Sequence, residues 1–161
     1  MRRRGFVLAG AAALAGCGFQ LRQAPDFSFR TIAVPSNSPV ATQLRRNLAT
    51  TPNVQVLPPA EAMKADVILD ILADTREKVV VGLNASGQVR EFQLRNRVQF
   101  RLRTPQGKEL IPSTELLQQR DVSFNESAVL AKEAEEGLLY RDMQTDLVQQ
   151  LLRRLAAVRT I

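Results

Sequence analysis

The chain has 161 residues, and its 22 Lys and Arg side chains outnumber its 16 Asp and Glu side chains to give a net charge of +6. It contains no histidine, which removes the usual general base of serine and cysteine hydrolases and the commonest transition-metal ligand. Its single cysteine excludes an internal disulfide. We therefore expect neither an enzyme nor a metal site. Catalysis by carboxylates alone stays open in principle. The acidic residues considered for it have no recognisable catalytic spacing, and they are Glu61, Asp66, Asp70 and Asp74.

The first seventeen residues have the pattern of a bacterial lipoprotein signal. Three arginines at 2–4 precede an apolar run over 6–15, and small residues lead into Cys17. Cleavage before the cysteine would remove residues 1–16 and leave Cys17 with a diacylglycerol group on its thiol and an acyl chain on its amine. Each buried methylene contributes about 0.8 kcal/mol, so three chains form a lasting membrane anchor. We predict this covalent lipid and no other cofactor.

Two other interpretations of this segment are an ordinary secretory signal with an incidental cysteine and a short membrane helix. The apolar run is shorter than the roughly 20 residues that a helix needs to cross a bilayer, and the only cysteine stands where lipidation requires it. Arg3-Arg4-Gly5-Phe6 also resembles a twin-arginine export motif, so the export route stays open. Residue 18 is glycine rather than the aspartate that usually retains bacterial lipoproteins at the inner membrane, which favours the outer membrane.

Cleavage would leave 145 of the 161 residues, enough for one domain with a sizeable core. Their nineteen basic and sixteen acidic side chains give a net charge of only +3, which argues against a nucleic-acid partner. We expect a lipidated tether over 17–30 and a single globular domain over 31–161.

The predicted domain begins with two short strands and a helix between them. A brief strand over 31–35 ends at a proline, and a helix follows that Ser38 caps and Pro52 ends. Apolar residues recur every four positions along this helix, which indicates one core-facing stripe. A second short strand over 54–57 and a single helical turn over 58–63 come next.

A three-stranded meander follows, and its middle strand carries the clearest periodic pattern of the chain. Long strands over 66–83 and 108–124 flank it, with turn residues at 84–87 and a proline, Pro112, that indicates an edge strand or a bulge. On the middle strand, the core-facing side chains are Phe92, Leu94, Val98, Phe100 and Leu102. The opposite side of that strand is polar and cationic.

A long final helix is predicted over 128–158. It has one leucine-rich seam, with glutamates near its start and arginines near its end, the polarity that complements the helix dipole. Two helices with one apolar stripe each can pack side by side on one face of a sheet. We therefore predict an α/β (α+β) two-layer sandwich, with about four strands in a mostly antiparallel or mixed sheet.

The polar side of the middle strand carries a stripe of four arginines, which stand at alternate residues about 6.6 Å apart. Guanidinium groups make forked hydrogen bonds to phosphate and carboxylate groups, so the stripe would suit an acidic protein wall or phosphates. The alternative is a solvated sheet face with partners such as Asp70, Asp74 and Glu91. The arginines of this stripe are Arg95, Arg97, Arg101 and Arg103.

Several segments of the chain resemble the LptE (RlpB) family of lipopolysaccharide (LPS)-assembly lipoproteins. Cys17-Gly18-Phe19-Gln20-Leu21-Arg22 resembles the Cys-Gly-aromatic-x-Leu-Arg start of that family. The hairpin over 84–93 resembles its central hairpin. Leu130-Ala131-Lys132-Glu133 resembles the opening of its last helix, and Leu151-Leu152-Arg153-Arg154-Leu155 resembles the end.

This resemblance implies a non-enzymatic protein that sits as a plug in the outer-membrane barrel LptD, helps that barrel to assemble, and contacts LPS. It also implies LPS binding through basic residues. Lys132 stands in the matching Leu-Ala-Lys context, and Arg120 occupies the approximately corresponding strand end. At the hairpin tip the chain departs from the family, and the nearest cation is Arg90. The alternative for Lys132 is an exposed lysine paired with Glu136 on the same helix.

The competing function is a free lipoprotein that faces the periplasm and binds a small lipid or an anionic ligand between sheet and helices. The two functions differ in whether partner protein shields the arginine face or water covers it.

Overall fold

The computed structural model describes residues 26–124 and 129–161, so the predicted signal at 1–16 and the lipidation site Cys17 lie outside the described residues. The elements follow the predicted order, with small shifts at their ends. In chain order they are β1 (Thr31–Ala33), α2 (Pro39–Ala49), β2 (Gln55–Leu57), η1 (Pro59–Lys64), β3 (Val67–Leu83), β4 (Val89–Arg103), β5 (Glu109–Ser123) and α3 (Val129–Ala156).

The strands join one sheet in the order β2-β1-β3-β4-β5. β1 pairs in parallel with both β2 and β3, whereas β3, β4 and β5 are antiparallel. The predicted mixed sheet is confirmed, but it has five strands instead of about four. Parallel neighbouring strands need a long crossover connection, and α2 supplies it between β1 and β2. Both short strands can therefore join the sheet.

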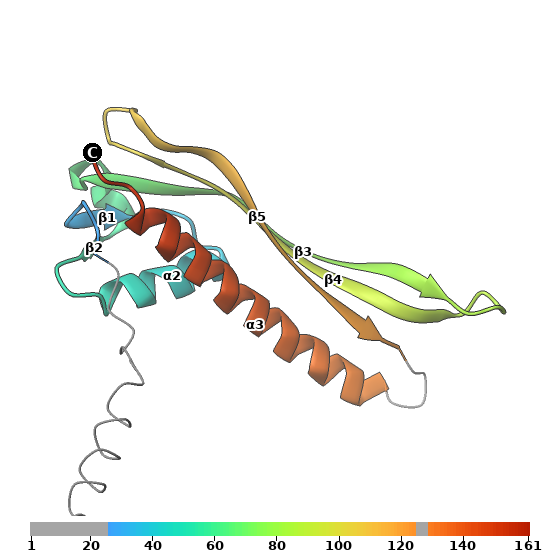
Figure 1. Cartoon of the computed structure of the whole chain (residues 1–161). Coiled ribbons are helices and arrows are strands. Elements are labelled where there is room, and N and C mark those ends of the chain that lie inside the picture. Colours follow the sequence, from blue (N-terminus) through green and yellow to red (C-terminus); the bar gives the residue numbers. More distant parts are fainter. Residues whose placement is uncertain (1–25, 125–128) are drawn as a thin grey trace, which may run out of the picture.

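Both helices pack on one face of this sheet (Figure 1), which confirms the two-layer sandwich. α2 begins at Pro39, where Ser38 Oγ accepts a hydrogen bond from the Ala41 amide at 3.2 Å, as predicted. α3 is 28 residues long and buries its predicted seam. No helix within the described ranges combines the length and apolar character needed to cross a bilayer. The fully buried core side chains include Leu44, Leu48, Phe100, Leu147 and Leu151.

The β3–β4 hairpin makes the molecule elongated. Asn84 Oδ1 accepts hydrogen bonds from the Ser86 and Gln88 amides in its turn, and Gly87 has a φ of 80°, a conformation that glycine adopts without strain. Figure 1 shows this turn beyond the ends of β5 and α3. We call this end of the molecule distal, and we call the opposite end, which holds β1, β2 and α2, basal.

A β-bulge in β3 changes which side chains face the helices. The register with β4 shifts between Ile71 and Ala73, so the alternation of faces reverses beyond this point. Asp74 therefore lies on the helix side, where its carboxylate accepts a hydrogen bond from the Val40 amide at 3.1 Å in the first turn of α2. The prediction that Asp74 shares a face with Asp70 is wrong, because the bulge adds one residue to the strand.

A second irregularity lies where the sequence predicts it. The β4–β5 register shifts between Phe100 and Leu102, whose partners on β5 are Thr114 and Ile111, so the extra residue falls at Pro112–Ser113. β5 is also an edge strand. Proline has no amide hydrogen to donate to a neighbouring strand. It is tolerated at an edge or a bulge because no neighbouring strand needs that hydrogen bond there.

The packed part of the chain begins before residue 31, inside the predicted tether. Phe29 is buried in the core, and Phe27 stacks on it with ring centroids 5.0 Å apart. Aromatic rings bury a large apolar surface when they leave water. The tether predicted over 17–30 is therefore too long at its C-terminal end.

Candidate functional site

The sheet face opposite the helices, here called the open face, carries the predicted arginine stripe. Along β4, even-numbered side chains from position 94 onward are buried, and the odd-numbered ones lie on the other side. η1 covers the basal end of the open face, where Ala62 packs with Ala33 and Ile68. The structure thus brings the four predicted arginines onto one face, Arg95, Arg97, Arg101 and Arg103.

The basal half of the stripe is held by one carboxylate. Asp70 lies opposite Arg101 in the β3–β4 register. Its Oδ2 atom accepts hydrogen bonds from Arg101 Nε at 2.9 Å and from Arg103 Nε at 2.8 Å. Burial raises the pKa of the Asp70 carboxyl, but the hydrogen bonds and charges of Arg103 and Arg101 outweigh this effect and hold the pKa below its usual value.

Replacing Asp70 by asparagine is expected to lower the free energy of unfolding at pH 7 by about 1–3 kcal/mol, because two arginines lose a charged partner. The pKa of Asp70 is lower in the folded protein than the roughly 3.9 of an unfolded chain. Its stabilisation is therefore complete above about pH 4 and disappears as the pH falls through the folded-state value. Urea unfolding at neutral and at acidic pH measures both effects.

The matched control is Glu115→Gln, which breaks an exposed ion pair with Arg97 of 3.5 Å. It should change stability by less than about 1 kcal/mol. A loss in Asp70→Asn that is the same at neutral and at strongly acidic pH would contradict the ionic explanation.

The distal half of the stripe keeps more free positive charge. Arg95 Nε donates to the neutral Gln93 side chain at 2.8 Å, and Arg97 reaches Glu115 only at 3.5 Å. Arg97 Nε is buried and has no hydrogen-bond partner among the described residues. Glu91, a predicted partner of the stripe, forms no ion pair within the described part of the chain. Arg95 and Arg97 are therefore the arginines best placed to meet an external acidic group.

The structure does not gather the three predicted LPS-binding cations into one site. Arg120 lies on the helix side and pairs with Asp146 of α3, Nη2 to Oδ2, at 3.0 Å. Arg90 is exposed at the base of the distal turn, where its carbonyl oxygen accepts a hydrogen bond from the Phe124 amide at 2.8 Å. Of the three, Lys132 lines a cavity.

That cavity lies at the distal end between the sheet and α3 and has a volume of about 80 Å³. Its wall includes a second lysine, Lys78, whose Nζ atom lies 2.6 Å from Glu136 Oε2. Lys132 Nζ pairs with Glu135 Oε2 at 2.9 Å, so the predicted Lys132–Glu136 pair is wrong. Reasoning from the sequence missed Lys78 because the β3 bulge places it on the helix side.

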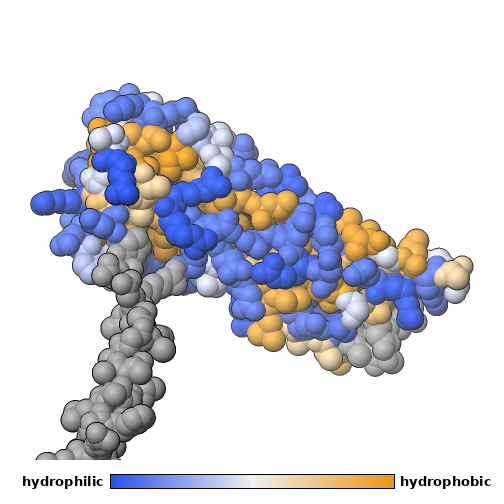
Figure 2. Space-filling view, viewed as in Figure 1, coloured by the Kyte–Doolittle hydropathy of each residue, from blue (hydrophilic) through white to orange (hydrophobic). Residues whose placement is uncertain are grey.

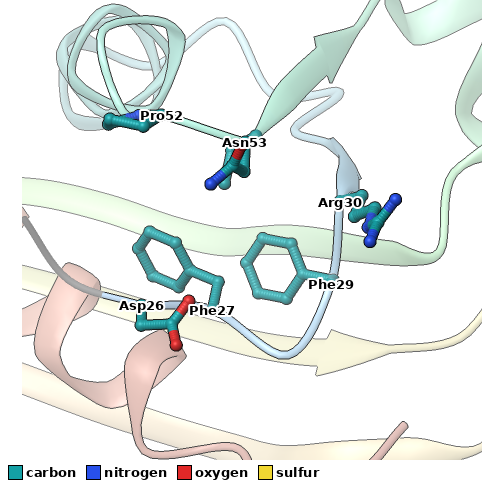
Figure 3. Close-up of a pocket in the computed structure, with 7 residues that line it drawn as sticks. Asp26, Phe27, Phe29, Arg30, Pro52 and Asn53 are labelled. Atoms are coloured by element: carbon teal, nitrogen blue, oxygen red, sulfur yellow. The ribbon is translucent and has the colours of Figure 1, made fainter.

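A larger cavity of about 480 Å³ lies at the basal end, and its volume falls in the usual range for small-molecule sites. Figure 3 shows the rings of Phe27 and Phe29 on one side and Pro52 and Asn53 on the other. Arg30, the only cationic residue among the described residues of its wall, points away from the two rings (Figure 3). The described part of the wall therefore brings no convergent cation to an anionic ligand.

The four acidic residues considered for carboxylate chemistry have separate contacts. Asp66 Oδ2 accepts hydrogen bonds from the Arg30 and Thr31 amides, 2.9 and 2.8 Å away, which hold the pKa of this carboxyl below its usual value despite the opposing effect of burial. Glu61 pairs with Lys64 in η1 at 3.4 Å. Asp70 and Asp74 lie on opposite faces of the sheet. These contacts are those of structural residues.

Comparisons with known proteins agree with this architecture. A family model described as "LptE: Lipopolysaccharide-assembly" matches residues 29–155. A protein named LPS-assembly lipoprotein LptE from Pectobacterium atrosepticum is 29% identical over 167 residues, which cover 98% of this chain and 88% of that protein. A protein of the same name from Yersinia pestis is 32% identical over 160 residues, covering 94% of this chain and 75% of the relative.

A solved structure shows the same fold. The solution NMR structure of an uncharacterized lipoprotein B from Nitrosomonas europaea superposes with a TM-score of 0.74 at 38% identity, over 87% of this chain and 91% of that chain. The match over residues 29–155 includes the sheet and both helices. This chain therefore belongs to the LptE family of lipoproteins and takes part in lipopolysaccharide assembly.

Proposed function

We propose that this protein is a lipid-anchored, non-catalytic plug and assembly factor of an LptD-like outer-membrane β-barrel, and that it binds LPS on its way to the outer leaflet. The domain would lie on the periplasmic side within the barrel, anchored through the acylated Cys17. The observation that carries the proposal is the open face, a long sheet surface on which η1 is the only helical cover among residues 26–124 and 129–161.

The side chains of the open face suit the inside of a barrel. A barrel lumen is lined by polar side chains, and the open face presents polar groups at alternate positions of β4 and β5. Gln99 Nε2 donates to Ser113 Oγ, and Gln93 Nε2 donates to Asp121 Oδ1, both at 2.9 Å. Such amide groups keep further donors and acceptors for a polar wall.

Contact with LPS is supported by the cations of the distal end. LPS carries phosphate groups on an acylated disaccharide, and ammonium and guanidinium groups make charge-assisted hydrogen bonds to phosphate. Lys132 lines the distal cavity, and Arg120 and Arg90 lie on β5 and β4 toward the same end. We assign LPS contact to Lys132 first, because it lines the distal cavity, whereas Arg120 reaches across to Asp146 of α3.

The test of the proposal is affinity purification of the full-length, lipidated protein from outer membranes in mild detergent. A large β-barrel protein should copurify at a constant ratio, and mass spectrometry should identify it as LptD-like. Isolation of a lone monomer under these conditions would contradict the plug and favour a free lipoprotein.

Replacing both Arg95 and Arg97 by glutamine is expected to weaken barrel capture about tenfold. Two partly exposed charge contacts of about 0.7 kcal/mol each make up that factor. Thermal unfolding of the isolated protein should change little, because Arg95 donates to the neutral Gln93 side chain and the exposed Arg97–Glu115 pair contributes little. The measurement is the amount of barrel retained on the immobilised variant over a series of salt concentrations.

The comparison variant replaces Arg101 and Arg103 by glutamine. It should mainly lower stability, because Asp70 loses both of its partners. Equal capture by the wild type and the Arg95/Arg97 variant would show that the distal half of the stripe is merely solvated.

A further inference from the structure

Lys78 and Lys132 bring two cations to one small cavity from distant parts of the chain. Lys78 stands on β3 and Lys132 stands near the start of α3. Their side chains are 39% and 25% exposed, so both are partly withdrawn from water. Building on the proposed LPS contact, we propose that this pair clamps one phosphate group of an acylated, phosphorylated glycolipid, and that Glu136 occupies Lys78 until the phosphate arrives.

Both lysines have hydrogen-bond donors to spare. An ammonium group has three donors. Lys78 uses one on Glu136 and lies over the Phe92 ring, 4.5 Å from its centroid. Lys132 donates to Glu135 and, at 3.3 Å, to Ser123 Oγ. A phosphate group has three acceptor oxygens and can therefore bridge the two ammonium groups while the Ser123 hydroxyl remains close.

The carboxylates of α3 repel an anion that enters the cavity. We therefore treat Glu136 as a competitor of the phosphate for Lys78, and not as a fixed support of that lysine. Glu133 and Glu136 both line the cavity. A partly exposed ion pair is only weakly stabilising, so a doubly charged phosphate can displace the carboxylate of Glu136. A ligand with a single weak charge gains less from the exchange. The pair therefore selects for phosphate.

The surroundings of the cavity fit an amphiphile rather than a free ion. Phe92 and Phe124 meet edge to face at 5.3 Å and, with Val122, form an apolar part of the wall. Several large aliphatic side chains are exposed at the distal end, where Figure 2 shows orange patches. Groups of exposed aliphatic side chains mark contact surfaces. These side chains are Val80, Val81, Leu83, Leu130 and Leu138. Cations inside an apolar rim match a phosphate carried by acyl chains.

The experiment measures binding of bisphosphorylated lipid A and of its dephosphorylated form to the full-length, lipidated protein in detergent. Lys78→Gln should weaken binding of the bisphosphorylated form about tenfold, the effect of one lost charge-assisted hydrogen bond, and should leave the dephosphorylated form unaffected. Lys78→Arg should restore most of the affinity. The control is Lys64→Gln at the basal end. It also removes a lysine that pairs with a glutamate, Glu61, but it lies far from the cavity and should have no effect.

Two further variants separate a clamp from a structural lysine. Lys78→Gln combined with Lys132→Gln should lose less than the product of the single losses, because both lysines hold one group. Glu136→Gln should strengthen binding about threefold by removing the competitor. A merely structural Lys78–Glu136 pair predicts weaker binding in Glu136→Gln, and that result would overturn the proposal. Inorganic phosphate alone should compete only at much higher concentration, and equal competition would assign the site to a free anion.

The design also separates this inference from the proposed function. If Lys132→Gln weakens binding and Lys78→Gln behaves like Lys64→Gln, the clamp is wrong and LPS contact through Lys132 stands. If the wild type binds both lipids equally, the phosphate clamp is wrong and LPS contact stands, whereas a wild type that binds neither lipid contradicts both.

Discussion

Replacing Phe100 by alanine is expected to lower the free energy of unfolding by about 3–5 kcal/mol. The ring is fully buried on β4 and packs in the core that both helices share with the sheet. Its removal loses the transfer free energy of the aromatic ring and leaves a cavity that the long strands on either side cannot close. Because domains of this size are stable by about 5–15 kcal/mol, the loss is a large fraction of the total.

Urea unfolding followed by circular dichroism measures this loss. The matched control is Leu83→Ala on the distal hairpin, where the side chain is 60% exposed. It should change the free energy of unfolding by less than about 0.5 kcal/mol. Similar losses in the two variants would mean that the core does not lie between sheet and helices.

Replacing Cys17 by alanine is expected to release the protein from the membrane fraction. Acyl chains attached to this residue would supply about 0.8 kcal/mol per buried methylene, and the variant would lose this direct hold on the bilayer. Fractionation of envelopes followed by immunoblotting measures the distribution.

Gly18→Asp is the control for the anchor. It keeps the cysteine and should keep the protein in the membrane fraction, but it should move it from the outer to the inner membrane. Mass spectrometry of the wild type should show an acylated Cys17 as the first residue. An unmodified thiol, or membrane attachment of Cys17→Ala equal to that of the wild type, would contradict the predicted lipoprotein.

Much of the fold could be predicted because it depends on local patterns. Ser38 and Pro39 start α2 through a hydrogen bond within one turn. The alternation along β4 separates buried side chains from the arginines, since a strand turns successive residues to opposite faces. The interruption at Pro112 follows from the missing amide hydrogen of proline. In each case the residues that carry the signal are neighbours in the sequence.

The candidate site at the distal end could not be predicted in the same way. Ile71 and Leu72 are both apolar, so the bulge between β3 and β4 leaves no break in the hydrophobic pattern of β3. That one extra residue decides that Asp74 meets α2 and that Lys78 meets α3. The partner of Lys78 lies 58 residues away. No local preference encodes such a contact.

The sequence by itself determined the order and type of the elements, the two-layer arrangement and the side of β4 that carries the arginines, because burial of apolar side chains follows the period of each element. The sequence offered Asp70, Asp74 and Glu91 as partners of the arginine stripe, and the tertiary structure decided which charges meet. Asp70 joins Arg101 and Arg103, and Glu136 joins Lys78 instead of Lys132. Ion pairs between elements depend on strand register and helix position, and the packing of the whole sheet sets both.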